Sequence, residues 1–189
     1  MDYLFERLHA APCDEIRVVT RPEKVDVLRH AKRRAAQAIL ASPESVPASI
    51  VAALGGLSSS DIVLIGFPDT IWEPLDGFRP LIGAVHAGAE VALGLFDGRE
   101  PSRSDVVCLG SSGTIERVVV KPEQPPSQVI WGCAAVRASV LDRAGDESEL
   151  GVLFDRLCRS GVVAGVWLSD LFLDIGTPEA LAVARRTPS

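Results

Sequence analysis

The sequence of 189 residues has no excess of positive charge, because 19 Lys and Arg side chains stand against 25 Asp and Glu, for a net charge of −6. Nucleic-acid-binding proteins need a basic face for phosphate contacts, so this balance argues against a nucleic-acid partner. Long hydrophobic runs are also missing. The longest, such as Asp61–Phe67 and Val162–Leu168, fall far short of the roughly 20 apolar residues that cross a bilayer. We therefore expect no membrane partner either.

Cysteine and histidine patterns for metal binding are absent as well. The four cysteines contain no CxxC pair, and the three histidines are far apart in the chain. This argues against a zinc site and against a disulfide framework. The N-terminus lacks the basic stretch and apolar core of a signal peptide. We expect a cytoplasmic protein with reduced, mostly buried thiols.

What is present is ordinary globular composition, with 47% hydrophobic and 23% charged residues. A chain of this length favours one domain, here residues 1–189, and can bury a core without disulfides or metals. Apolar periodicity and turn signals predict its elements. The expected helices are residues 3–11, 22–40, 45–57, 77–87, 149–160 and 179–186, and the expected strands are 15–20, 61–66, 90–96, 105–109, 115–121, 129–136 and 162–167, with 170–174 extended.

The order of these elements predicts the fold class. Strands and helices alternate in the first half, which is typical of an open, mostly parallel, Rossmann-like α/β sheet with helices on both faces. Consecutive strands in the middle of the chain indicate a small antiparallel annex.

Ionisable residues follow three of the expected strands, where ligands bind in open α/β sheets. Asp69 follows DIVLIG, Asp174 follows VWLSDLFL, and Lys121 ends IERVVV. Two carboxylates suit Mg²⁺, which keeps room for water and phosphate oxygens, and a lysine supplies a point charge for a phosphate. Each residue also has a structural interpretation, as a turn or capping aspartate or as a surface lysine.

Three stretches resemble the sugar-phosphate nucleotidylyltransferases of the glucose-1-phosphate thymidylyl- or uridylyltransferase type. They are GFPDTIWEP (66–74), VVVKPEQPPSQVIWGCAAVR (118–137) and LDIGTPEALAVA (173–184). The last is the most specific, since Asp-x-Gly-Thr-Pro-Glu before an apolar residue recurs near that family's end. The order and spacing of the three also fit.

The resemblance implies that a sugar 1-phosphate, by analogy glucose 1-phosphate, attacks the α-phosphorus of a nucleoside triphosphate and displaces pyrophosphate. It implies a role in nucleotide-sugar synthesis, for example for polysaccharides. By the family pattern Asp69 and Asp174 hold Mg²⁺, Lys121 holds the phosphate of the sugar substrate, and Gly132 gives the sugar a close backbone approach.

The sequence departs from the family pattern at several points, and one is the stretch SPESVPAS, which has Ser45, Pro47 and Ser49 where the family has a glycine that contacts the base. The glycine-rich loop Gly-x-Gly-x-Arg and its strand, which open the family's chains, do not occur, and Val120 stands where the family has a glutamate. The absent strand lies inside the family's sheet and would leave two neighbours unpaired. Three explanations are open: the true start codon lies further upstream, the remaining strands pair across the gap, or the chain is a fragment of a longer protein. A catalytically inactive sugar-phosphate-binding or regulatory homologue is the alternative function, and Trp72 and edge strands are compatible with a homo-oligomer.

Overall fold

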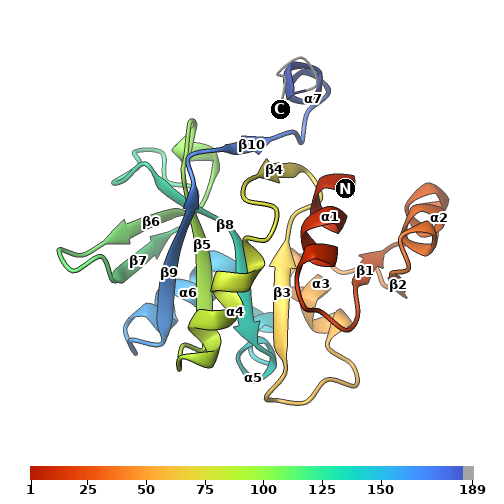
Figure 1. Cartoon of the computed structure of the whole chain (residues 1–189), viewed down its shortest axis with the longest axis horizontal. Helices are drawn as coiled ribbons and strands as arrows, with labels where there is room; N and C mark the ends of the chain where they lie inside the picture. Colours follow the sequence, from red (N-terminus) through yellow and green to blue (C-terminus); the bar gives the residue numbers. More distant parts are fainter. Residues whose placement is uncertain (185–189) are drawn as a thin grey trace.

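The computed structural model describes residues 1–184 and has strands and helices throughout its length (Figure 1). The helices are α1 (Asp2–Ala10), α2 (Val25–Arg33), α3 (Val46–Ala53), α4 (Phe78–His86), α5 (Ala138–Leu141), α6 (Leu150–Cys158) and α7 (Pro178–Ala184), with short 3₁₀ turns η1 (Pro101–Arg103) and η2 (Ala144–Asp146). The strands are β1 (Arg17–Thr20), β2 (Gln37–Leu40), β3 (Ile62–Gly66), β4 (Thr70–Trp72), β5 (Val91–Asp97), β6 (Val106–Leu109), β7 (Ile115–Val119), β8 (Val129–Arg137), β9 (Val163–Ser169) and β10 (Phe172–Asp174).

A six-stranded mixed sheet forms the centre of the molecule. Its strands follow the order β7-β6-β8-β5-β9, and β3 pairs with the second half of β8. β5 and β9 are parallel, whereas β8 runs against β3, β5 and β6. β3, β5, β6 and β9 therefore share one direction, and the reversed β8 lies among them.

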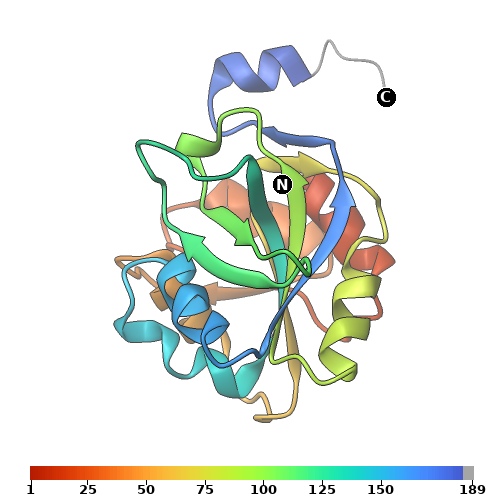
Figure 2. The ribbon, with the colours of Figure 1, turned by 90° about the vertical axis from the view of Figure 1, so that its left-hand side faces the viewer.

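Helices cover both faces of this sheet, as the alternation of elements predicts. Figures 1 and 2 show α1 and α4 on one side and α3 and α6 on the other. The α4 side buries Phe78, Leu81 and Val85 against the sheet, and the α6 side buries Leu153 and Phe154. The central strands β3, β5 and β8 are almost wholly apolar because both faces of the sheet are covered there. The predicted α/β class is confirmed.

Residues 37–40 form strand β2, which corrects the prediction of one helix from 22 to 40. The helix α2 ends at Arg33, and Ala35 then adopts a left-handed φ of 54°, which breaks the helical path. The segment after it pairs in parallel with β1, Gln37 opposite Arg17. The segment AAQAIL (35–40) has helix propensity, but its backbone forms hydrogen bonds with β1, and this pairing overrides the local preference.

The β1–β2 pair is a separate two-stranded sheet. Within residues 1–184, β1 pairs with β2 and β3 pairs with β8, and β1 and β3 share no ladder.

A second two-stranded sheet, β4–β10, accounts for the antiparallel annex together with the β6–β7 hairpin. β10 was expected as an extended segment, whereas β4 was not predicted. The final helix α7 begins at Pro178 as expected, with Thr177 Oγ1 accepting a hydrogen bond from the backbone N–H of Ala180 at 3.1 Å. Residues 185 and 186 of the expected helix lie outside the described residues.

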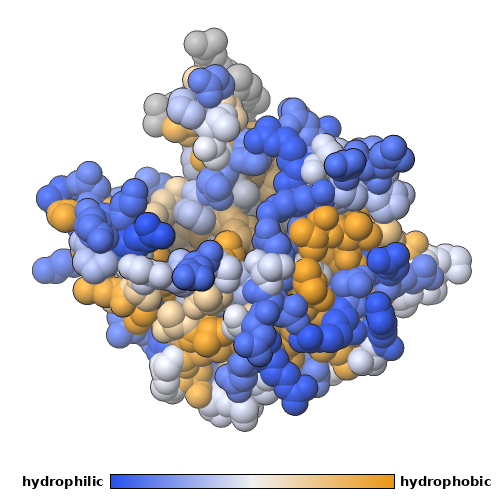
Figure 3. All heavy atoms as spheres, turned by 180° about the vertical axis from the view of Figure 1, so that it is seen from behind, coloured by the Kyte–Doolittle hydropathy of each residue, from blue (hydrophilic) through white to orange (hydrophobic). Residues whose placement is uncertain are grey.

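The surface seen from behind is largely hydrophilic, with scattered apolar areas (Figure 3). Val51 of α3 and Val152 of α6 are among the exposed apolar side chains, and Trp167 on the edge strand β9 is 50% exposed. Trp72, in contrast, is only 1% exposed and packs against Phe78, so it offers no surface for self-association. Across residues 1–184, none of the helices has the length and apolar character that a membrane crossing needs.

Candidate active site

Asp69 lies in the tight turn that connects β3 to β4. The turn is closed by Thr70, whose backbone N–H and hydroxyl both donate to the carbonyl of Phe67, at 3.4 and 3.0 Å. These bonds leave the Asp69 side chain exposed at the carboxyl end of the strand. The position is the one that the sequence predicts for a ligand-binding carboxylate.

Asp174 reaches the same place from the other end of the chain. In the antiparallel β4–β10 ladder it is paired with Thr70, the residue after Asp69. One residue further on, the backbone N–H of Ile175 donates to the carbonyl of Asp69 at 2.7 Å. The ladder therefore fixes Asp174 beside the turn that carries Asp69.

The carboxylates of Asp69 and Asp174 both lie close to the position that a Cβ atom of Gly176 would occupy. A Cβ at Gly176 would lie 3.0 Å from Asp174 Oδ1 and 3.3 Å from Asp69 Oδ2. The Gly176 N–H also donates to Asp174 Oδ1 at 2.7 Å. The absence of a side chain at this residue lets the two carboxylates approach each other. The structure thus brings together two of the predicted site residues.

The donor set of this carboxylate pair fits Mg²⁺. Within residues 1–184, no group of three or more His, Cys, Asp and Glu side chains is arranged to hold a metal. Mg²⁺, however, is commonly held by one or two carboxylates and completes its octahedron with water and phosphate oxygens. Asp69 and Asp174 are both exposed, so a phosphorylated ligand can reach them.

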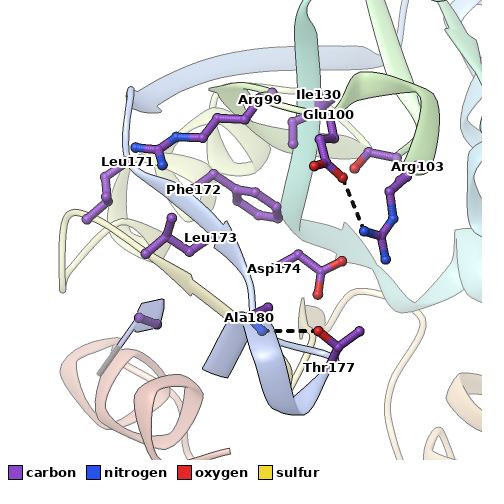
Figure 4. Close-up of a pocket in the computed structure, with 13 residues that line it drawn as sticks. Arg99, Glu100, Arg103, Ile130, Leu171, Phe172, Leu173, Asp174, Thr177 and Ala180 are labelled. Atoms are coloured by element: carbon purple, nitrogen blue, oxygen red, sulfur yellow. Dashed lines mark hydrogen bonds and ion pairs between the residues drawn. The ribbon is translucent and has the colours of Figure 1, made fainter. Parts of the chain in front are cut away.

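A pocket of about 330 Å³ adjoins the carboxylate pair between η1, β10 and α7 (Figure 4). Asp174 lies on its wall, and Figure 4 shows its carboxylate facing the same space as Arg103. Arg103 forms an exposed ion pair with Glu100 at 3.1 Å. Phe172 supplies an apolar wall. The pocket therefore combines an exposed carboxylate, the positive charge of Arg103 and an apolar surface.

Lys121 lies just beyond β7, at the N-terminus of α6, where it is paired with Glu149. Its ammonium donates to Glu149 Oε1 at 2.6 Å, and this bond raises the pKa of Lys121 while partial burial acts in the opposite direction. Lys121 also has a φ of 38°, a conformation that residues with a side chain rarely adopt. Among the described residues its ion-pair partner is Glu149, not Asp69 or Asp174.

Asp105, which has no distinguishing pattern in the sequence, is a half-buried carboxylate beside Lys121. Burial raises its pKa, while the charge of Lys121 opposes that change. The indole N–H of Trp131 is close enough to lower the pKa of Asp105. Asp105 Oδ1 and Trp131 Nε1 are both buried, and neither has a hydrogen-bond partner of ordinary geometry among the described residues. Asp105 and Glu149 thus lie beside the predicted phosphate-binding lysine, and Trp131 lies beside Asp105.

Gly132 lies at a bulge in β8. Cys133 is opposite Gly94 and Trp131 is opposite Leu95, so Gly132 has no partner in β5. A Cβ at this position would lie 2.2 Å from the ring of Phe172, which comes from β10. The glycine is therefore required for packing of the β10 ribbon on the central sheet. The role that the resemblance implies, a backbone approach to the sugar, stays a prediction.

Comparison with known proteins shows similarity at the level of the fold. No family model matches the chain, and no curated protein matches it in sequence. Among solved structures, the chain is similar to a protein from Bacillus anthracis that is provisionally assigned as a glucose-1-phosphate thymidylyltransferase and was determined in complex with sucrose. The TM-score is 0.79 at 16% identity, over 100% of this chain and 83% of that chain. The resemblance read from the sequence is thus supported for the fold.

The packing role of Gly132 predicts opposite effects for the same substitution at two glycines. Gly132→Ala forces the new methyl group against Phe172 and should lower the free energy of unfolding by about 1–3 kcal/mol. Gly83→Ala, in α4 with nothing near its Cβ position, should raise it by about 0.5–1 kcal/mol. Urea denaturation of both variants checks this. Equal effects at the two positions would contradict it.

The raised pKa of Asp105 predicts a pH-dependent change in stability. Burial favours the neutral carboxyl of Asp105 in the folded protein. The stability that this carboxyl contributes is complete below the pKa of about 3.9 that it has in the unfolded chain, and it is lost as the pH rises through its pKa in the folded protein. Asp105→Asn should therefore gain stability relative to the wild type between pH 4 and pH 7, measured by urea denaturation at both values. A difference that stays constant with pH would show that Asp105 is ionised as freely in the folded as in the unfolded chain.

Proposed function

We propose that this chain is a nucleotidyltransferase-like enzyme that transfers a nucleoside monophosphate from a nucleoside triphosphate to a sugar 1-phosphate, with glucose 1-phosphate as the first sugar to test. The observation that carries the proposal is the convergence of Asp69 and Asp174 at Gly176. The fold shared with the Bacillus anthracis protein and the three sequence stretches support it. We further propose that residues 1–189 act as one domain and serve nucleotide-sugar synthesis for polysaccharides in the cytoplasm.

In this proposal Asp69 and Asp174 hold Mg²⁺. When bound, the ion neutralises charge that develops on the phosphates. A phosphate oxygen of the sugar 1-phosphate forms a bond to the α-phosphorus, and the bond from that phosphorus to the bridging oxygen of pyrophosphate breaks. Such a reaction depends on positioning and charge more than on covalent help from the protein. The chain's task is therefore to align two anions beside a carboxylate pair.

Lys121 would hold the phosphate of the sugar substrate after leaving Glu149. The ion pair between them is partly exposed, with 52% of the Lys121 side chain and 36% of the Glu149 side chain accessible. Such pairs contribute about 0–1 kcal/mol, so a dianionic phosphate can replace Glu149 as the partner. The left-handed backbone of Lys121 also supports a functional role, because strained residues cluster at functional sites.

A binding or regulatory protein without catalysis is the second candidate. It is favoured by Val120, which stands where the family has a glutamate next to the phosphate-binding lysine. In that case Lys121 would still bind a sugar phosphate, but no pyrophosphate would be released.

Pyrophosphate release distinguishes the two candidates. The wild type should release pyrophosphate from glucose 1-phosphate and a nucleoside triphosphate with Mg²⁺, each of the four common bases being tried in turn. Asp69→Asn and Asp174→Asn should each reduce the rate by about 100-fold or more, since each removes a charge that stabilises the transition state. Asp142→Asn is the matched control, because Asp142 is an exposed aspartate that follows α5 at the opposite end of the molecule (Figure 1).

No release by the wild type, together with glucose 1-phosphate binding by calorimetry, would reject the enzyme in favour of the binding protein. Release that survives in both aspartate variants would reject the carboxylate pair as the site.

The Lys121–Glu149 pair predicts effects of opposite sign on sugar-phosphate affinity. Lys121→Met should weaken glucose 1-phosphate binding by about tenfold, since a charge-assisted hydrogen bond to phosphate is lost. Glu149→Gln removes the competing carboxylate and should strengthen binding by up to about fivefold. Calorimetric titration measures both. Weaker binding in Glu149→Gln would show that Glu149 assists Lys121 instead of competing with the ligand.

A further inference from the structure

Helix α1 contacts both ends of the segment that carries Asp69. Leu4 packs on Gly66, where a Cβ would lie 2.4 Å from Leu4 Cδ1, and Arg7 reaches Trp72 and Glu73. Leu4 and Arg7 are three residues apart and therefore lie on the same face of the helix. One helical face thus brackets the turn from β3 to β4.

Arg7 makes the polar part of this contact from a buried position. The residue is 3% exposed, and its guanidinium donates from Nη1 to the carbonyl of Tyr3 at 2.8 Å and from Nη2 to the carbonyl of Trp72. Nη2 also lies 3.4 Å from Glu73 Oε1, and the guanidinium carbon lies 4.9 Å from the centre of the Trp72 ring. Burial lowers the pKa of Arg7, opposed chiefly by the charge of Glu73. Such a buried cation is costly unless its partners are fixed.

The guanidinium of Arg7 binds β4, a strand that is too short to be stable by itself. β4 and β10 are three residues long and pair only with each other among the described strands. An isolated two-stranded ladder of this length is marginal in water. The position of Asp174 beside Asp69 therefore requires that something outside the ladder hold β4 in place.

We propose that Arg7 is a positioning residue, which holds the carbonyl of Trp72 and so fixes β4, the β4–β10 ladder and the approach of Asp69 to Asp174. Its consequence for metal binding rests on the function proposed above. Arg7 does not touch substrate or metal in this role. It acts through the backbone that places the two carboxylates.

The test uses Arg7→Met, which keeps a long apolar stem without the guanidinium, and Arg7→Lys, which keeps the charge but cannot serve two carbonyls in the same geometry. Arg34→Met is the matched control. Arg34 forms an ion pair with Asp2 of α1, so its loss removes an arginine contact of the same helix without touching β4. Glu73→Gln removes the ion pair and leaves the bond from Arg7 to Trp72 in place.

Amide hydrogen exchange of the full chain, measured without any ligand, reports how firmly β4 and the β4–β10 ladder are held. The N–H of Ile175, which donates to the Asp69 carbonyl, should exchange about tenfold faster or more in Arg7→Met, and less so in Arg7→Lys. Arg34→Met and Glu73→Gln should stay within about twofold of the wild type. Each variant is measured where far-UV circular dichroism shows it to be folded. If Arg7→Met does not fold, Arg7→Lys against Arg34→Met decides.

Unchanged exchange at Ile175 in the Arg7 variants, or an equal change in Arg34→Met, would overturn the proposal.

The affinity of the Asp69–Asp174 pair for Mn²⁺ tests the consequence for the carboxylates, and it is measured from the electron paramagnetic resonance signal of the free ion. Arg7→Met should weaken Mn²⁺ binding about tenfold, with Arg34→Met within about twofold. Mn²⁺ that binds equally well to Arg7→Met and the wild type would reject the link from Arg7 to the metal site and leave the proposed function intact. A wild type that binds no Mn²⁺ would reject the proposed metal site, while the exchange at Ile175 still decides the role of Arg7.

Discussion

The backbone pairing of β10 with β4 is the interaction on which the candidate site depends. Asp69 and Asp174 are separated by more than half the chain. Two carboxylates repel each other unless a cation or hydrogen-bond donors lie between them. They meet because Thr70 pairs with Asp174 and the carbonyl of Asp69 accepts the N–H of Ile175. The backbone thus imposes an approach that the charges alone would resist.

Several contacts attach this short ladder to the rest of the molecule, and two of them depend on residues with little room. On the sheet side, Phe172 of β10 packs over Gly132 and against Phe96, with ring centres 5.1 Å apart. On the helix side, Arg7 holds the carbonyl of Trp72. An aromatic ring over a bulge glycine and a buried guanidinium are each intolerant of small changes. The site is therefore sensitive to substitutions that are distant from its carboxylates.

The sequence predicted most strands and helices because the central sheet is covered on both faces. A strand such as DIVLIG is then apolar throughout, and its boundaries are set by polar turns. The prediction was wrong at 37–40, where a helix-forming sequence lies beside a strand with free hydrogen-bonding groups. It missed β4 because three residues are too few for a period to be recognised. Asp105 and Arg7 gave no signal, since an isolated charge in a sequence is usually at the surface.

By itself, the sequence determined the α/β class, the two carboxylates at strand ends and the resemblance to sugar-phosphate nucleotidylyltransferases, because these depend on residue type and order along the chain. Only the tertiary structure decided that Asp69 and Asp174 converge, that Lys121 is paired with Glu149 and that Arg7 is buried under β4. The physical reason is that a ladder or an ion pair joins residues far apart in the chain, and its register depends on how whole elements pack. No local pattern records that packing.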